Sequence, residues 1–116
     1  MAEQHCIFCQ VVAGKISADI IYTDERAVAF RDINPQAPVH ALVIPREHMD
    51  SLDEAATRDE DVLGHLLRVA SRVANAEGLS GSGYRTIINT GAGAGQSVFH
   101  LHLHVVGGRP LNWPPG

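Results

Sequence analysis

The chain has 116 residues and a formal net charge of −4, from nine lysines and arginines against thirteen aspartates and glutamates. This length suits one compact domain, and we expect residues 1–116 to form it. The lack of a basic run argues against a nucleic-acid polymer as partner, and no apolar stretch approaches the roughly 18 residues of a membrane span. We therefore expect a soluble, cytoplasmic protein.

The N-terminal segment predicts a short helix and then a hairpin. Residues 6–12 form a brief helix or turn that carries Cys6 and Cys9. Residues 20–23 and 27–31 predict two strands joined by a tight turn. A single C-x-x-C pair, rather than a spread disulfide framework, suits a reducing compartment and a metal or redox role.

Prolines and capping patterns divide the middle of the chain. Residues 34–38 hold two prolines and predict a loop, and residues 40–44 predict a third strand that Pro45 ends. Residues 51–54 and 57–60 both match the capping-box pattern, so each predicts the start of a helix.

A long amphipathic helix is predicted over residues 58–77. Gly78 is a natural left-handed terminator, and His65 lies off the apolar stripe, where we expect it to face solvent. The stripe that faces the core consists of Val62, Leu66, Val69, Ala70 and Val73.

The C-terminal part of the chain returns to strands. Residues 84–90 predict a fourth strand and residues 100–106 a fifth that pairs with it antiparallel. This order predicts an α+β fold, in which a five-stranded antiparallel sheet carries one long helix and a short N-terminal helix. Residues 109–116 cannot form regular structure, and the only tryptophan, Trp113, suggests that this tail docks on its own domain or on a second subunit.

Three histidines alternate with apolar residues in the fifth strand. His100, His102 and His104 would point to one side of the sheet, about 7 Å apart, because a strand rises roughly 3.3 Å per residue. A single histidine on a strand is usually structural, but three on one face favour a site that acts on a phosphate or carbonyl. The residues between them, Leu101, Leu103 and Val105, would point into the core.

Residues 91–95 are rich in glycine and precede this strand. They do not match a dinucleotide fingerprint, because a strand follows them and not a helix. They form either a flexible connection or a nest of backbone amides for a phosphate, which Gln96 and Ser97 would then also face.

The segment from His100 to Val106 resembles the H-φ-H-φ-H-φ-φ signature of the histidine triad (HIT) superfamily. Residues 32–40, 95–98 and 113–116 resemble its Hint branch, so the likeness covers nearly the whole chain. The resemblance implies a HIT domain that hydrolyses the P–N bond of purine nucleoside 5′-phosphoramidates, of the AMP-amine or AMP-lysine type, and works as a homodimer. No cofactor would be needed for that chemistry.

The residue types suggest how such a reaction would proceed. A neutral imidazole is a good nucleophile, and attack by His102 on the α-phosphorus would give a nucleotidyl-histidine intermediate. His104, Ser97, Asn89 and backbone amides such as that of Gly95 would stabilise the phosphoryl charge.

The resemblance implies further contacts for the nucleotide. It places Ser97 and Gln96 near the phosphate and Asp32 at the ribose hydroxyls. His40 would orient His102 or His104, or would be structural. The base would lie in an apolar slot whose members are Phe8, Val11, Phe30 and Ile33.

The resemblance also implies a structural zinc site. Some relatives combine a C-x-x-C pair with two histidines, which here correspond to Cys6, Cys9, His48 and His100. Buried, inert cysteines are the alternative. If His100 binds zinc, it cannot also carry protons, and it would instead hold the histidine segment.

Two other functions stay open at this point. The chain could hydrolyse a dinucleoside polyphosphate of the Ap4A type, or it could be a nucleotide-binding regulatory module without turnover. The first predicts faster cleavage of P–O–P than of P–N bonds, and the second does not require the nucleophile His102. The sequence does not identify the amine or the preferred purine.

Overall fold

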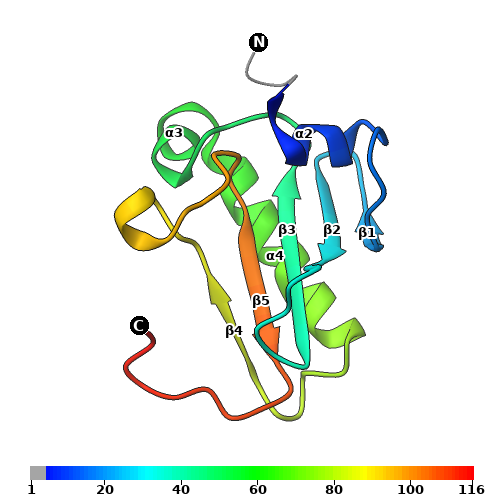
Figure 1. Ribbon diagram of the computed structural model, residues 1–116, viewed down its shortest axis with the longest axis vertical. Helices are drawn as coiled ribbons and strands as arrows, with labels where there is room; N and C mark the ends of the chain where they lie inside the picture. The colour runs from blue at the N-terminus through cyan, green and yellow to red at the C-terminus, as the bar shows by residue number, and fades with distance from the viewer. Residues whose placement is uncertain (1–4) are drawn as a thin grey trace.

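A five-stranded antiparallel sheet forms the centre of the computed structural model, which describes residues 5–116 (Figure 1). The strand order is β1-β2-β3-β5-β4, and helix α4 lies across one face. This is the predicted α+β architecture, including the short N-terminal helix. The elements are α2 (Ile7–Val12), β1 (Ile20–Thr23), β2 (Ala27–Arg31), β3 (Val39–Pro45), α3 (Leu52–Arg58), α4 (Glu60–Ala76), β4 (Tyr84–Ile87), the 3-10 turn η1 (Ala92–Ala94) and β5 (Leu103–Gly107).

Two apolar clusters share the sheet, because side chains alternate between its faces along β2 and β3. The larger cluster lies between the sheet and α4, and it contains the predicted helix stripe as well as Leu101, Leu103 and Val105. The smaller lies on the opposite face under α2, and its members are Phe8, Val11, Val28, Phe30, Leu42 and Ile44. A six-residue helix is too short to be stable alone, so packing on this second cluster supports α2.

The β1–β2 hairpin turns at Asp24, whose carboxylate accepts four hydrogen bonds. The backbone N–H groups of Arg26 and Ala27 donate at 2.7 and 2.8 Å, and the Tyr22 hydroxyl donates at 2.7 Å. His65 Nε2 of α4 lies 2.7 Å from the same carboxylate. The expectation that His65 faces solvent is therefore wrong, because its ring is half-buried and joins α4 to the hairpin.

The two helices in the middle of the chain start differently from one another. Ser51 precedes α3, as predicted. The prediction that Thr57 starts the second helix is wrong, because Thr57 lies within α3 and its hydroxyl donates to the Glu54 carbonyl. Asp59 caps α4 instead, accepting from Val62 N–H at 3.2 Å. The long helix therefore spans fewer residues than the predicted 58–77.

The histidine segment is a strand only in its last part, so the prediction of a continuous strand over residues 100–106 is wrong at its start. β5 begins at Leu103, and His100 and His102 precede it in irregular backbone. The neighbouring strand β3 ends at Pro45, which has no N–H to donate and whose carbonyl oxygen lies 2.8 Å from His100 Nε2. The fourth strand ends at Ile87 rather than at residue 90, where its pairing with β5 stops.

The tail after β5 has no helix or strand, as predicted. Arg85 of β4 donates to the Asn112 carbonyl at 2.9 Å, and Arg109 donates to the Gln36 carbonyl at 3.0 Å, so the tail is tied to the sheet. Trp113 is 82% exposed, which contradicts docking on its own domain; docking on a second subunit stays a prediction. Within residues 5–116, no helix has both the length and the apolar character to cross a bilayer.

Candidate active site and metal centre

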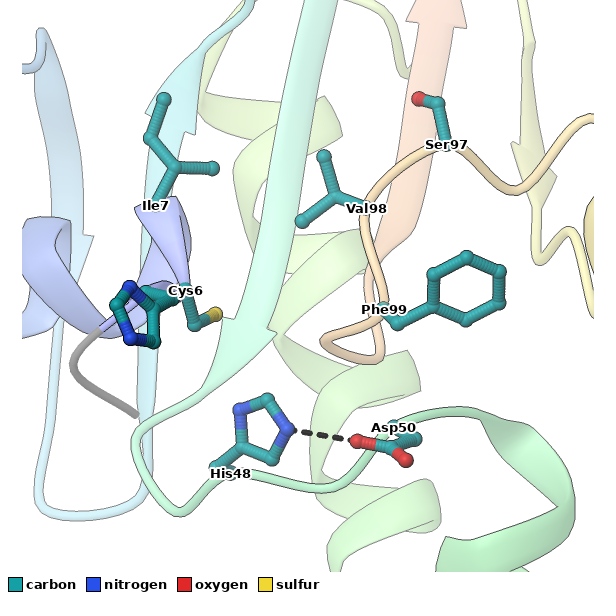
Figure 2. A pocket seen from close by; sticks show the side chains of 8 residues that line it. Cys6, Ile7, His48, Asp50, Ser97, Val98 and Phe99 are labelled. Atoms are coloured by element: carbon teal, nitrogen blue, oxygen red, sulfur yellow. Dashed lines mark hydrogen bonds and ion pairs between the residues drawn. The ribbon is translucent and has the colours of Figure 1, made fainter. Parts of the chain in front are cut away.

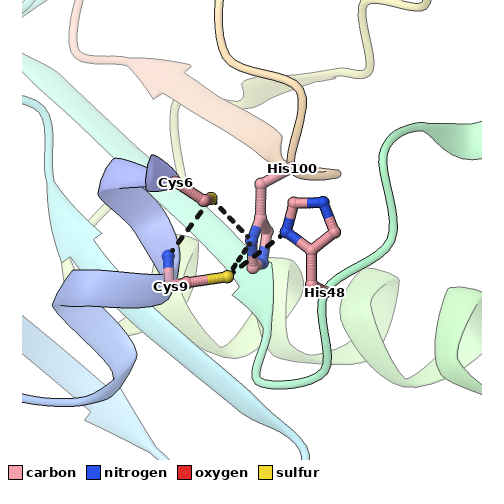
Figure 3. Close-up of side chains that lie close together, drawn as sticks. All are labelled: Cys6, Cys9, His48 and His100. Atoms are coloured by element: carbon pink, nitrogen blue, oxygen red, sulfur yellow. Dashed lines mark hydrogen bonds between the residues drawn. The ribbon is translucent and has the colours of Figure 1, made fainter. Parts of the chain in front are cut away.

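Two cysteines and two histidines converge at one end of the sheet (Figure 3). Cys6 precedes α2 and Cys9 lies one turn further along, whereas His48 follows β3 and His100 precedes β5. Cys6 Sγ lies 3.3 Å from His100 Nδ1, and Cys9 Sγ lies 3.2 Å from His48 Nδ1 and 3.4 Å from His100 Nδ1. These four residues, the Cys2His2 cluster, are the ones that the sequence nominates for zinc.

The hydrogen-bond partners of the two histidines assign their tautomers. His100 Nε2 donates to the Pro45 carbonyl at 2.8 Å, and His48 Nε2 donates to Asp50 Oδ1 at 2.7 Å. Both rings therefore present a lone pair on Nδ1 toward the sulfur atoms. Burial, opposed only in part by the Pro45 hydrogen bond, lowers the pKa of His100 to about 4 and keeps it neutral.

This donor set fits a tetrahedral metal ion. Zinc bonds of about 2.3 Å to sulfur and about 2.0 Å to nitrogen put neighbouring S and N ligand atoms roughly 3.6 Å apart, slightly more than the distances here. The four ligand atoms all lie within 4.8 Å of one another. Asp50 and the Pro45 carbonyl supply the outer hydrogen bonds that orient metal-bound imidazoles. The cluster can therefore hold a metal ion.

His102 has the opposite orientation. Its Nδ1 donates to the backbone carbonyl of His100 at 2.8 Å, so the lone pair is on Nε2. The ring is buried, with the Phe8 ring edge-on at 5.1 Å between centroids. Burial lowers the pKa of His102, and the ring is thereby neutral and nucleophilic near neutral pH.

His40 and His104 form a hydrogen-bonded pair beside His102. The Gln36 N–H donates to His40 Nδ1 at 3.0 Å, so the His40 proton is on Nε2, between His104 Nδ1 at 2.9 Å and Asp32 Oδ2 at 3.4 Å. His104 accepts on Nδ1 and therefore carries its own proton on Nε2. Burial, and then the neighbouring imidazoles, lower the pKa of His104 to about 4.

Asp32, His40 and His104 also lie close enough together to suggest a metal site. The hydrogen bond from Gln36 argues against it, because it fixes the His40 proton on the nitrogen that a metal would need. We assign this trio to a proton-bearing network, which agrees with the predicted orienting role of His40. The centroids of His102 and His104 are 5.0 Å apart, less than the sequence-based 7 Å.

A cavity of about 290 Å³ opens beside these histidines. Its polar lining includes Asp32, Ser97, His102 and His104. Its apolar lining contains all four residues of the predicted base slot, Phe8, Val11, Phe30 and Ile33, together with Ile7, Ile16, Leu42 and Val98. Ile33 is 97% exposed and so lies at the rim. The predicted base slot and four of the predicted polar residues therefore meet at one cavity, and their role in binding stays a prediction.

Asn89 lies elsewhere. It lines a second cavity, of about 430 Å³, on the other side of His104, together with His40 and residues of the tail such as Leu111. Figure 2 shows a third depression, an open groove of about 370 Å³ between the Cys2His2 cluster and residues 97–99. Ile7, Ser97 and Val98 line both this groove and the histidine cavity, so the two are neighbours.

In the glycine-rich loop, several of the backbone N–H groups that an amide nest would use are bonded within the loop. The N–H groups of Gly95 and Gln96 donate to the loop carbonyls of Ala92 and Gly91, at 3.0 and 3.1 Å. The Gln96 side chain is buried; its Oε1 accepts from Gly91 N–H at 2.9 Å, and its Nε2 donates to the Asp50 carbonyl at 2.7 Å. These groups hold the loop, and contacts of Gly95 and Gln96 with a nucleotide stay a prediction.

Sequence reasoning missed several residues of the site. Leu42 and Val98 line the cavity, Asp50 orients His48, and Gln36 sets the tautomer of His40. Leu42 could have been found from its alternation with His40 along the third strand. The Gln36 contact uses a backbone N–H and has no sequence signal.

Known proteins are similar to this chain in sequence and fold. Residues 13–111 match the family model described as the HIT domain. The chain is 52% identical over 114 residues to an uncharacterized HIT-like protein of Synechococcus elongatus, covering 98% of this chain and 99% of that one. The crystal structure of a HIT family hydrolase from Legionella pneumophila matches with a TM-score of 0.93 and 45% identity, covering 97% of this chain and 100% of that one. A histidine triad nucleotide-binding protein from Candida albicans matches with a TM-score of 0.82 and 29% identity, covering 94% and 82%.

Proposed function

The chain belongs to the HIT domain family, and from this premise we propose that it is a nucleotide-binding hydrolase that cleaves the P–N bond of purine nucleoside 5′-phosphoramidates. The observation that carries the proposal is the orientation of His102, whose Nδ1 is held by a carbonyl while Nε2 keeps its lone pair. Binding alone would not require that arrangement. Two structural neighbours, a HIT family hydrolase and a histidine triad nucleotide-binding protein, support it.

The reaction runs in two displacements. The Nε2 lone pair of His102 attacks the α-phosphorus, the P–N bond breaks, and the leaving amine takes up a proton from solvent at its nitrogen. Water then attacks the nucleotidyl-histidine, restores the lone pair and returns a proton to solvent. His104 carries a proton on Nε2, and this N–H can donate a hydrogen bond to a phosphoryl oxygen in both steps.

The substrate would lie along the cavity beside these histidines. Phe8, Val11 and Phe30 offer an apolar slot for a purine, which such a slot recognises by shape and stacking. Asp32 accepts a ribose hydroxyl, and its negative charge disfavours a 2′-phosphate. Ser97 lies on the same wall and would contact the phosphate.

We further propose that the Cys2His2 cluster binds zinc as a structural ion. Thiolate and imidazole ligands suit zinc, and four protein ligands leave no open position for substrate. When bound, the ion would fix the four ligand side chains and take no part in the displacement. The absence of a disulfide at Cys6 and Cys9 suits a reducing, cytoplasmic compartment.

We also propose a homodimer. Trp113 is exposed, and other residues of its tail line a cavity together with His104, so a second copy that contacted Trp113 would lie near that histidine. Sedimentation of the full chain tests this, and a monomer at micromolar concentration would contradict it.

The test of function compares two substrates. Native protein should release AMP from an adenosine phosphoramidate much faster than it cleaves a dinucleoside polyphosphate, and His102→Ala should abolish release while still binding AMP. Faster cleavage of the polyphosphate would transfer the assignment to that activity. Binding of AMP without cleavage of either substrate would leave a regulatory module.

A further inference from the structure

We propose that the Cys2His2 cluster regulates the nucleotide cavity: an ion bound by Cys6, Cys9, His48 and His100 raises the affinity of the cavity for a purine nucleotide. The cluster and the cavity are separate sites, yet they share α2 and the histidine segment. The inference rests on the proposed function insofar as it takes the cavity to bind a nucleotide.

The first link is α2. Cys6 and Cys9 belong to the cluster, while Phe8 and Val11 of the same short helix line the cavity. Because α2 has only six residues, the attachment of its side chains decides where it lies. Fixing Cys6 and Cys9 to one ion therefore also fixes the wall against which the base would pack.

The second link is His100. Its ring points to the two sulfur atoms, and its backbone carbonyl holds Nδ1 of His102 at 2.8 Å. The Phe8 ring contacts both histidines edge-on, at centroid distances of 6.0 and 5.1 Å. A shift of His100 would thus move the carbonyl that sets the tautomer of His102.

Without an ion, weak contacts join the sulfur and nitrogen atoms of the cluster. The sulfur and nitrogen atoms meet at 3.2 to 3.4 Å, as thiol–imidazole hydrogen bonds that local motion can break. An ion replaces them with four bonds to one point and removes that freedom. A nucleotide then binds a wall that is already ordered, so less conformational entropy is lost on binding.

Coupling of this kind is reciprocal and can be measured without turnover. Calorimetry would give the dissociation constant of AMP for the full chain, kept reduced, with one equivalent of Zn²⁺ and after removal of metal by a chelator. We expect zinc to tighten AMP binding between about 5-fold and 150-fold. Competition with a chromogenic chelator should show that AMP tightens Zn²⁺ binding by the same factor.

Two variants serve as a matched pair. His48→Gln removes a ligand that lies outside α2 and does not line the nucleotide cavity; it should bind AMP as the metal-free native chain does, at zinc concentrations that saturate the native protein. His65→Gln alters a histidine that lies outside both sites, and it should keep the full coupling factor.

The outcomes separate this inference from the proposed function. Equal AMP affinity with and without bound zinc overturns the coupling and leaves the hydrolase proposal standing. Absence of AMP binding in both states overturns both. If zinc does not bind to the native chain, the coupling fails regardless of the nucleotide result.

Discussion

The Cys2His2 cluster and the proposed catalytic group, His102 with His40 and His104, lie next to each other and both present imidazole nitrogens, yet they are suited to different chemistry. In the cluster, His48 and His100 donate from Nε2 and turn Nδ1 toward sulfur. In the proposed catalytic group, His102 donates from Nδ1, which leaves the lone pair on Nε2. The acceptor that each ring finds therefore decides what its other nitrogen can do.

This comparison explains how two alternating histidines reach two sites. His100 and His102 would share one side of a regular strand, but the backbone before Leu103 is irregular. The neighbouring strand β3 ends at Pro45, which has no N–H to donate to a paired strand. The His100 ring donates to the Pro45 carbonyl and faces the cysteines, and the backbone carbonyl of His100 accepts from His102 Nδ1. One irregular segment thus connects the Cys2His2 cluster to the proposed nucleophile, His102.

Replacing His102 and His100 by glutamine, one at a time, tests this comparison with the largest expected effect. His102→Gln should lower turnover of a phosphoramidate by about 10⁴- to 10⁶-fold, because the nucleophile is lost, and should keep one metal ion per chain. His100→Gln should lose the ion. Steady-state rates and metal analysis of the same preparations check both, and loss of metal in His102→Gln would contradict the separation of the two centres.

Removal of a sulfur ligand should act mainly on stability. An ion present at 1,000 times its dissociation constant stabilises the native state by about 4 kcal/mol, and Cys9→Ser should lose most of that in zinc-containing buffer. Thermal unfolding with and without Zn²⁺ measures it. The metal-free forms of Cys9→Ser and of the native chain should unfold at nearly the same temperature; a large gap between them would mean that the thiol acts through packing.

The outer hydrogen bond of the cluster should have a smaller effect. Asp50→Ala removes the acceptor that orients His48, and such partners contribute about 10- to 100-fold to metal affinity. Because the Asp50 side chain is 64% exposed, we expect the lower end, about tenfold. Zinc competition assays check this, with Asp53→Ala as a control on the neighbouring helix.

The fold could largely be predicted from the sequence because its signals are local. The hairpin over residues 20–31 and the stripe of α4 follow from alternation and helical periodicity, and both match the structure. The errors occur where another side chain intervenes, the distant Asp24 at His65 and the nearby Asp59 at the start of α4. Thr57 has the right spacing for a cap, but Asp59 is the residue whose carboxylate reaches the free N–H of Val62.

For the candidate site, the sequence could predict which residues take part but not how their rings are oriented. The resemblance nominated Cys6, His48 and His100, and the structure brings them together. Which ring nitrogen faces which partner depends on main-chain groups such as the Gln36 N–H and the Pro45 carbonyl. Every residue has such groups, so no sequence pattern marks the ones that matter.

The smallest expected effect extends the comparison to a histidine outside both centres, His65, whose partner Asp24 makes it structural. Partial burial acts to raise the pKa of Asp24, but hydrogen bonds from Arg26, Tyr22 and Ala27 outweigh it and hold the pKa well below its ordinary value of 3.8. A carboxyl with a depressed native pKa stabilises the fold above its unfolded pKa, and this contribution is lost as pH falls toward the native value.

Asp24→Asn should therefore lower the free energy of unfolding by about 1 kcal/mol at pH 7, because the amide keeps the acceptor for two backbone N–H groups and loses the charge. The gap between variant and native chain should close progressively below about pH 4, where the unfolded carboxyl takes up its proton first. Urea unfolding across pH 7 to 3 measures it. A gap that stays constant over that range would show that the charge of Asp24 contributes nothing, and that this hairpin is held by hydrogen-bond geometry alone.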